Sequence, residues 1–73
     1  MSHYYRIALP SGQGWDYVFC GTLGIEQNFG EVWTATYQNA HVYTSEQVAE
    51  QTLAAIKREY KLNREPIIRG EAI

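Results

Sequence analysis

The fold is decided by residues 43–60, which read YTSEQVAEQTLAAIKREY. The start of this stretch carries two helix signals. The Thr44 hydroxyl can accept a hydrogen bond from the amide of Gln47 while the Gln47 side chain reaches back to the amide of Thr44, which makes a capping box. Tyr43 and Val48 occupy the two positions of a hydrophobic staple. The sequence therefore predicts an α-helix that begins directly after Thr44.

The apolar residues of this helix fall on one stripe. At about 100° per residue they lie within an arc of roughly 60°. They are Ala49, Leu53, Ile56 and Tyr60. A helix of this length is only marginally stable in water by itself, so most of its stability has to come from burying that stripe. We expect the helix to span about residues 45–61 and to pack on a layer formed by the rest of the chain.

Three segments before the helix have the alternation of β-strands. They are residues 1–9, 15–23 and 31–37. In the first of them Tyr5, Ile7 and Leu9 share one face, which we expect to lie against the helix. Pro10 and the glycines that follow it predict a hairpin turn after the first strand, and Gly21 predicts a bulge or an early end of the second strand.

The chain after the helix offers one more element. Pro66 prevents the helix from continuing, and residues 66–69 can form either a short edge strand or an arm that docks on another subunit. Together these elements predict an α+β fold, in which one amphipathic helix packs on one face of an antiparallel three-stranded meander. The C-terminal edge strand, where it forms, is the fourth strand of this sheet.

The chain of 73 residues is long enough for one small domain, spanning residues 1–73. A core of this size stabilises a fold only narrowly, and natural proteins of this length add disulfides, a metal or a second subunit. Cys20 is the only cysteine, so a disulfide within the chain is excluded. A second subunit is the stabilising device that this composition favours.

The sequence shows no sign of a membrane or secretion segment. No apolar run is long enough to cross a bilayer, and the N-terminal residues lack the basic and apolar regions of a secretion signal. A single free cysteine is typical of a reducing compartment. We therefore expect a cytoplasmic protein with no membrane partner.

Candidate catalytic and ligand-binding residues are few. Residues 12–14, Gly-Gln-Gly, resemble a fragment of a phosphate-binding loop, but a strand follows them where such loops need a helix, so they predict a turn. Cys20 with His3 or His41 can make a nucleophile and base, although Cys20 lies among apolar residues that are typical of a buried cysteine. The two histidines and the carboxylates lack the short spacings of a metal site. We expect no enzyme activity, no metal and no cofactor.

Positive charge is concentrated after residue 56. Five of the six basic residues lie there, namely Lys57, Arg58, Lys61, Arg64 and Arg69. A basic ridge of this kind, with aromatic side chains for stacking, can bind nucleic acid. However, the net charge of the chain is −2, acidic residues are interleaved with the basic ones, and cations are favoured at the end of a helix by its dipole. Nucleic-acid binding is therefore the alternative interpretation.

One helix covers only one face of a three-stranded sheet, and the opposite face carries apolar residues. The candidates for an interface on that face and on the C-terminal arm are Tyr4, Val18, Cys20, Val32, Ile67 and Ile68. An exposed apolar patch of this kind usually marks a binding surface. The alternative is that an irregularity near Gly21 shifts the strand alternation and moves some of these side chains into the core.

These observations favour a small non-enzymatic protein-interaction module. We expect it to form a homodimer through the sheet face or the C-terminal arm and to act by occupying the surface of a partner protein, as an accessory subunit or a phage-type inhibitor does. The first alternative is a nucleic-acid-binding accessory protein that uses the basic residues after the helix. The second is a small enzyme with Cys20 as its nucleophile.

Overall fold

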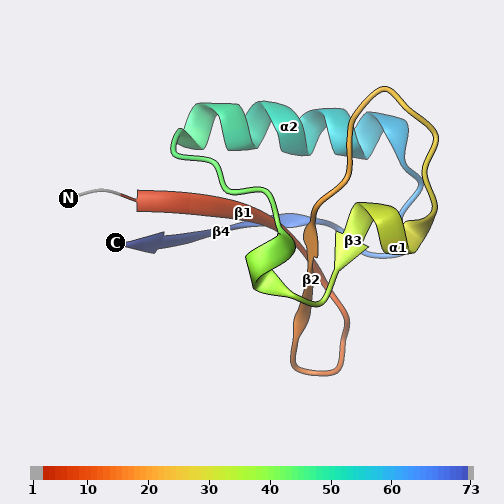
Figure 1. The fold of residues 1–73 in the computed structure, drawn as a ribbon, viewed down its shortest axis with the longest axis horizontal. Helices are drawn as coiled ribbons and strands as arrows, with labels where there is room; N and C mark the ends of the chain where they lie inside the picture. The colour runs from red at the N-terminus through yellow and green to blue at the C-terminus, as the bar shows by residue number, and fades with distance from the viewer. Residues whose placement is uncertain (1–2, 73) are drawn as a thin grey trace.

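The computed structural model describes residues 3–72, and within them a four-stranded antiparallel sheet carries one long helix on one face (Figure 1). The strands are β1 (His3–Pro10), β2 (Asp16–Phe19), β3 (Trp33–Thr34) and β4 (Ile67–Ala72). The helices are α1 (Phe29–Val32), the short 3-10 turn η1 (Tyr37–Asn39) and the long α2 (Glu46–Glu59). The strand order is β3-β2-β1-β4. The predicted α+β class is confirmed, and the C-terminal segment supplies the fourth strand.

The predicted long helix is α2, but its start lies one residue later than the sequence suggested. Ser45 is the cap, and its hydroxyl accepts a hydrogen bond from the Val48 amide at 3.4 Å. The predicted cap at Thr44 is therefore wrong. With Ser45 as the cap, Tyr43 and Val48 no longer occupy the two staple positions, and the Val48 side chain is 46% exposed. Thr44 and Ser45 are both good capping residues, so the sequence pattern fits two starts equally well.

The apolar stripe of α2 packs on the sheet as predicted. Ala49 and Ile56 are completely buried, while Leu53 and Tyr60 are half-buried against the same cluster. The sheet contributes buried side chains from three strands. They are Ile7 and Leu9 from β1, Phe19 from β2 and Trp33 from β3. The helix-facing side of β1 was thus predicted correctly for its two core residues.

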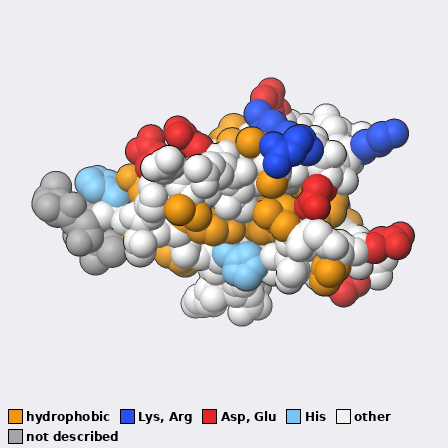
Figure 2. All heavy atoms as spheres, turned by 90° about the horizontal axis from the view of Figure 1, so that it is seen from above, with side chains coloured by type: hydrophobic (Ala, Val, Ile, Leu, Met, Phe, Trp, Pro, Cys, Tyr) orange, Lys and Arg blue, Asp and Glu red, His pale blue; other side chains and the backbone are white. Residues whose placement is uncertain are grey.

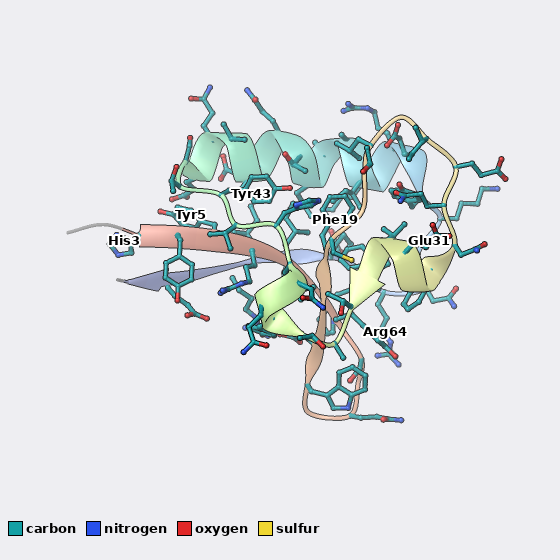
Figure 3. The ribbon with its side chains drawn as sticks, in the orientation of Figure 1. His3, Tyr5, Phe19, Glu31, Tyr43 and Arg64 are labelled. Atoms are coloured by element: carbon teal, nitrogen blue, oxygen red, sulfur yellow. The ribbon has the colours of Figure 1, made fainter. Side chains whose placement is uncertain are left out.

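The strands β1 and β2 form the predicted hairpin but pair over only part of their length. Their register joins Ala8 to Val18 and Leu9 to Tyr17. Towards the start of β1, residues 41–43 lie between β1 and the end of β2. There the Tyr5 amide donates to the Tyr43 carbonyl at 2.7 Å and the Tyr43 amide donates to the Tyr5 carbonyl at 2.9 Å. Figure 3 shows these two side chains close together between β1 and α2. Residues 1 and 2 of the predicted first strand lie outside the described residues, as does residue 73 of the domain.

The predicted third strand over residues 31–37 is wrong. Only Trp33 and Thr34 are in a strand, because Glu31 and Val32 belong to α1 and Tyr37 begins η1. The Glu31 carboxylate accepts a hydrogen bond from the Asn28 amide at 3.3 Å, which fixes the first turn of α1. The second strand ends early, before Gly21, as the glycines of that segment indicated.

The C-terminal segment is a strand of the same sheet rather than an arm. It runs from Ile67 to Ala72, beyond the predicted range 66–69, and pairs antiparallel with β1. Ile68 lies opposite Ile7 on the helix side, whereas Ile67 lies opposite Ala8 on the other side. Within the described part of the chain, no helix is both long and apolar enough to span a membrane.

Candidate interaction surface

The side of the sheet that faces away from α2 is called the open face here. Strand alternation and the strand registers place one set of residues on it. The set is Tyr4, Arg6, Ala8, Asp16, Val18, Ile67, Arg69 and Glu71. The centre of this face is apolar and its outer part is charged and aromatic.

The apolar centre of the open face is enclosed within a single chain. Ala8 and Val18 have no exposed surface, so the prediction that Val18 is exposed for binding is wrong. Val32 is 2% exposed and packs in the helix-side core, because it belongs to α1 and strand alternation does not apply to it. An interface formed by these two side chains would require the core to open.

The remaining predicted interface residues lie in different places. Tyr4 and Ile67 are half-buried on the open face, and Ile68 is half-buried on the helix side. Cys20 follows β2, where its amide donates to the Val32 carbonyl at 2.7 Å. The structure therefore does not bring the six predicted residues together into one exposed patch.

An arginine and two tyrosines form a network on the open face that the sequence did not reveal. The guanidinium carbon of Arg6 lies 4.9 Å from the ring centre of Tyr4 and 5.2 Å from that of Tyr37. Glu71 connects Tyr4 and Arg6, because its carboxylate accepts a hydrogen bond from the Tyr4 hydroxyl at 2.6 Å and lies 3.6 Å from Arg6 Nη1. The Arg6 side chain is only 15% exposed, and its buried Nε has no hydrogen-bond partner among the described residues. The rings and the carboxylate hold the arginine in a fixed orientation.

Beside this network lies a groove of about 730 Å³ at the hairpin end of the open face. Its lining includes Pro10, Trp15, Asp16, Tyr37 and Arg69. Arg69 Nε donates to Asp16 Oδ2 at 3.0 Å, which pairs the two charges in the wall of the groove. Trp15 is 42% exposed and Tyr37 is 39% exposed. The groove is therefore bordered by two exposed aromatic residues and by a charge pair that is already satisfied.

The five basic residues considered for nucleic-acid binding do not form one ridge. Arg69 lies on the open face with Asp16, and Lys57 donates to Glu65 at 2.8 Å. Arg64 and Lys61 line a pocket near the first hairpin turn, where the Arg64 guanidinium lies over Gly12. On the helix side, Figure 2 shows Lys and Arg side chains interleaved with Asp and Glu side chains.

Among the described residues, no hydrogen bond joins the candidate nucleophile Cys20 to a histidine. Its thiol donates to the Glu31 carbonyl at 3.4 Å, while His41 Nε2 donates to the Gly21 carbonyl at 2.7 Å. Burial raises the pKa of the Cys20 thiol, which keeps it protonated and less nucleophilic near neutral pH. Residues 3–72 contain no group of three His, Cys, Asp or Glu side chains that could hold a metal ion.

Comparison with known proteins adds no further guide to function. No family model, no curated protein and no solved structure matches this chain. A fold does not determine a function in any case, because unrelated activities recur on the same fold. The function therefore has to be argued from the surface.

Proposed function

We propose that this chain is a non-enzymatic protein-interaction module that forms a homodimer and acts by occupying the surface of a partner protein, in the manner of an accessory subunit or a phage-type inhibitor. The observation that carries the proposal is the groove on the open face. Its lining includes the Asp16–Arg69 pair and the exposed residues Tyr37 and Trp15, the latter at the hairpin turn, where its ring packs against Tyr17. Trp, Tyr and Arg are the residue types that dominate the binding energy of protein interfaces.

The aromatic residues of the groove are supported by neighbouring side chains, which favours binding. The Trp15 ring packs edge-on against Tyr17 with 4.6 Å between ring centres, and Tyr37 is held by Arg6. Side chains that are already ordered lose little conformational entropy when a partner arrives. This support from neighbouring residues is what a preformed binding site needs.

The charges of the groove indicate the kind of partner group that fits. Asp16 is only 13% exposed and its carboxylate is already paired with Arg69, so the groove offers little net charge. An uncharged aromatic or aliphatic side chain fits such a groove better than an ionic one, because burying an unpaired charge is costly. We propose an apolar anchor residue of the partner as the occupant of the groove.

Capture of a partner by the immobilised chain tests the proposal. The partner is first isolated from an extract of cells that express this chain, and its affinity is then measured with purified proteins. Trp15→Ala with Tyr37→Ala is expected to weaken binding by tenfold or more, as loss of central aromatic anchors does at known interfaces. The matched control is Val42→Ala with Val48→Ala, which removes two equally exposed apolar side chains outside the groove.

Three results would contradict this proposal. They are full binding by the groove variant, equal loss of binding in the control variant, and a wild-type chain that captures no partner. Circular dichroism of each variant shows whether the fold is intact. Sedimentation of the purified wild-type chain at micromolar concentration tests the homodimer, and a strictly monomeric species would contradict that part of the proposal alone.

A further inference from the structure

The strand β4 presents the longer of the two edges of the sheet. It has six residues, whereas β3 at the opposite edge has two. Pro66, which precedes β4, is buried, but Arg69, Gly70 and Glu71 are exposed. An edge strand carries a row of backbone donors and acceptors that can pair with another strand.

The hydrogen bonds of β1 show which β4 groups point outwards. The amide and carbonyl of Tyr5 bond to Tyr43, so they point away from β4. In an antiparallel pair the bonding direction alternates along the strand, so Tyr4 and Arg6 bond to their β4 partners Glu71 and Arg69. The amides and carbonyls of Ile68 and Gly70 therefore point to the outer edge. These are the groups that a second strand would bond.

A second copy can meet this edge antiparallel about a two-fold axis, because most homo-oligomers have closed symmetry. The charges distinguish the candidate registers. With Arg69 on the axis, two arginines oppose each other, and with Glu71 on the axis, two glutamates do. With Ile68 on the axis, Gly70 lies opposite Pro66, which has no amide to donate.

Only Gly70 on the axis makes the strand complementary to itself. Arg69 of each copy then lies opposite Glu71 of the other, on the same face and in a non-hydrogen-bonded pair, where facing side chains are closest. Both side chains are accessible for this contact, at 52% and 47% exposure. Gly70 has no side chain to obstruct the approach, and the Tyr5 ring already covers its helix side.

We infer that β4 is a homodimer interface in which a second copy pairs antiparallel with Gly70 on the two-fold axis and with Arg69 of each copy opposite Glu71 of the other. This inference rests on the homodimer of the proposed function and adds the surface and the register. The two sheets then join into one continuous sheet. Both grooves lie on the same side of it, so one partner with two anchor residues can bind both at once.

A cysteine scan tests the register directly. In a Cys20→Ser background, single cysteines replace Ile68, Arg69, Gly70 and Glu71 in turn, with Val48→Cys as the control away from the edge. Only the residue on the axis faces its own copy, at roughly 5.5 Å between Cα atoms, which lies in the range that a disulfide spans. A Cβ at Gly70 would lie 3.1 Å from the Tyr5 ring, so this ring has to shift by a few tenths of an ångström to admit the new side chain. With that shift, Gly70→Cys is expected to form a covalent dimer fastest under oxidation. A maximum at another β4 position would overturn the register, and rates no higher than that of the control would overturn the interface.

Mixing charge variants gives a second test that does not depend on the new cysteine. Arg69→Glu places acidic side chains opposite each other, and Glu71→Arg places basic ones opposite each other. Each variant alone is expected to dimerise roughly tenfold or more weakly than wild type, because like charges now oppose each other twice. A mixture of the two restores opposite charges at both pairs, so heterodimers should form with near wild-type affinity.

The mixture of Arg69→Glu and Glu71→Arg contains the same two folded chains as the separate samples. Any recovery of dimerisation in the mixture therefore comes from the contact between copies and not from a change within one chain. Arg58→Glu, on the exposed side of α2, is the matched control and is expected to leave dimerisation unchanged. Equal weakness of the mixture and of the single variants would overturn the inferred pairs. Binding of the partner protein through Trp15 and Tyr37 is measured separately, so the groove proposal can stand when the register fails.

Discussion

The two edges of the sheet are built differently. At one edge β3 is only two residues long, and its Trp33 is 3% exposed next to a Val32 that is 2% exposed. At the other edge β4 is six residues long, and three consecutive residues from Arg69 to Glu71 are exposed. The β3 edge is protected from pairing with other strands because it is short and buried. The β4 edge is protected only by its charged side chains.

This difference shows how a small sheet can limit its partners. A buried, short edge offers few backbone groups to any other strand. Charges on a long edge disfavour most strands, but Arg69 and Glu71 have opposite signs and stand two residues apart. In the inferred homodimer these charges disfavour the other registers and favour the one about Gly70, so repulsion and attraction act together.

The largest loss of stability is expected at the β3 edge. Trp33→Ala removes a buried indole whose ring lies 5.6 Å from that of Phe19, and such truncations cost about 3–5 kcal/mol. This is a large part of the total stability of a domain of this size, at roughly 0.05–0.15 kcal/mol per residue. Urea denaturation measures the loss. Ile67→Ala at the β4 edge is the comparison. A loss of unfolding free energy as large as that of Trp33→Ala would show that the β3 and β4 edges are equally important for the fold.

A smaller effect is expected from the close approach that closes the β3 edge. A Cβ on Gly21 would lie 2.9 Å from the Cα of Val32, so Gly21→Ala forces two backbones apart and should cost about 1–3 kcal/mol. Gly30→Ala is the matched control, since a Cβ there has nothing within 4 Å. It should stabilise the fold by about 0.4–1 kcal/mol by restricting the unfolded chain.

Neither glycine has a positive φ, so steric contact and not backbone strain separates the two substitutions. Urea denaturation of both variants decides the matter. Equal free energies of unfolding would mean that residues 21 and 32 do not approach as closely as the structure has them.

The elements that sequence reasoning predicted well have long, regular patterns. The stripe of α2 repeats over several turns, and the alternation of β1 places Ile7 and Leu9 on the buried side. The turn after Pro10 is marked by two glycines, both of which adopt positive φ. Each of these signals is local, so it does not depend on contacts with distant parts of the chain.

The prediction failed over residues 31–37 because alternation there was coincidental. A four-residue helix has no periodicity to detect, but Asn28 followed by Glu31 is a capping-box signature that could have indicated it. Reading Val32 as part of α1 would have moved it from the predicted interface to the core. The third strand would then have been correctly short.

The open face could be predicted only in part. Alternation places Tyr4 and Arg6 on one side of β1 and Ile7 on the opposite side, where it packs in the core. The contact of Arg6 with Tyr37 joins residues far apart in sequence through η1, which no local pattern predicts. Tyr37 lines the groove, so the sequence alone could suggest a candidate face but not the presence of Tyr37 on it.

The smallest effect is expected from the Lys57–Glu65 pair, which lies where α2 leads into β4. A hydrogen bond from Lys57 and the positive charge of that residue hold the pKa of the Glu65 carboxyl below its ordinary value. Lys57→Ala should let this pKa rise back towards its ordinary value, as an NMR titration of the Glu65 side chain would show. Lys61→Ala is the control and should leave the titration unchanged.

The same pair gives a weak dependence of stability on pH, with a fixed sign. Because the pKa of Glu65 is lower in the folded chain, the unfolded chain binds more protons in the acid range, and the stabilisation is present above the unfolded pKa and lost as pH falls through the folded pKa. Lys57→Ala should remove only this acid-range component, which urea denaturation at neutral and acid pH can compare. Glu65 is fully exposed, so solvent screens the pair strongly and the change should be the smallest of the series. The contrary result is a loss of unfolding free energy in Lys57→Ala as large as that in Gly21→Ala. It would mean that β4 is held in place by its connection to α2 and not by its pairing with β1.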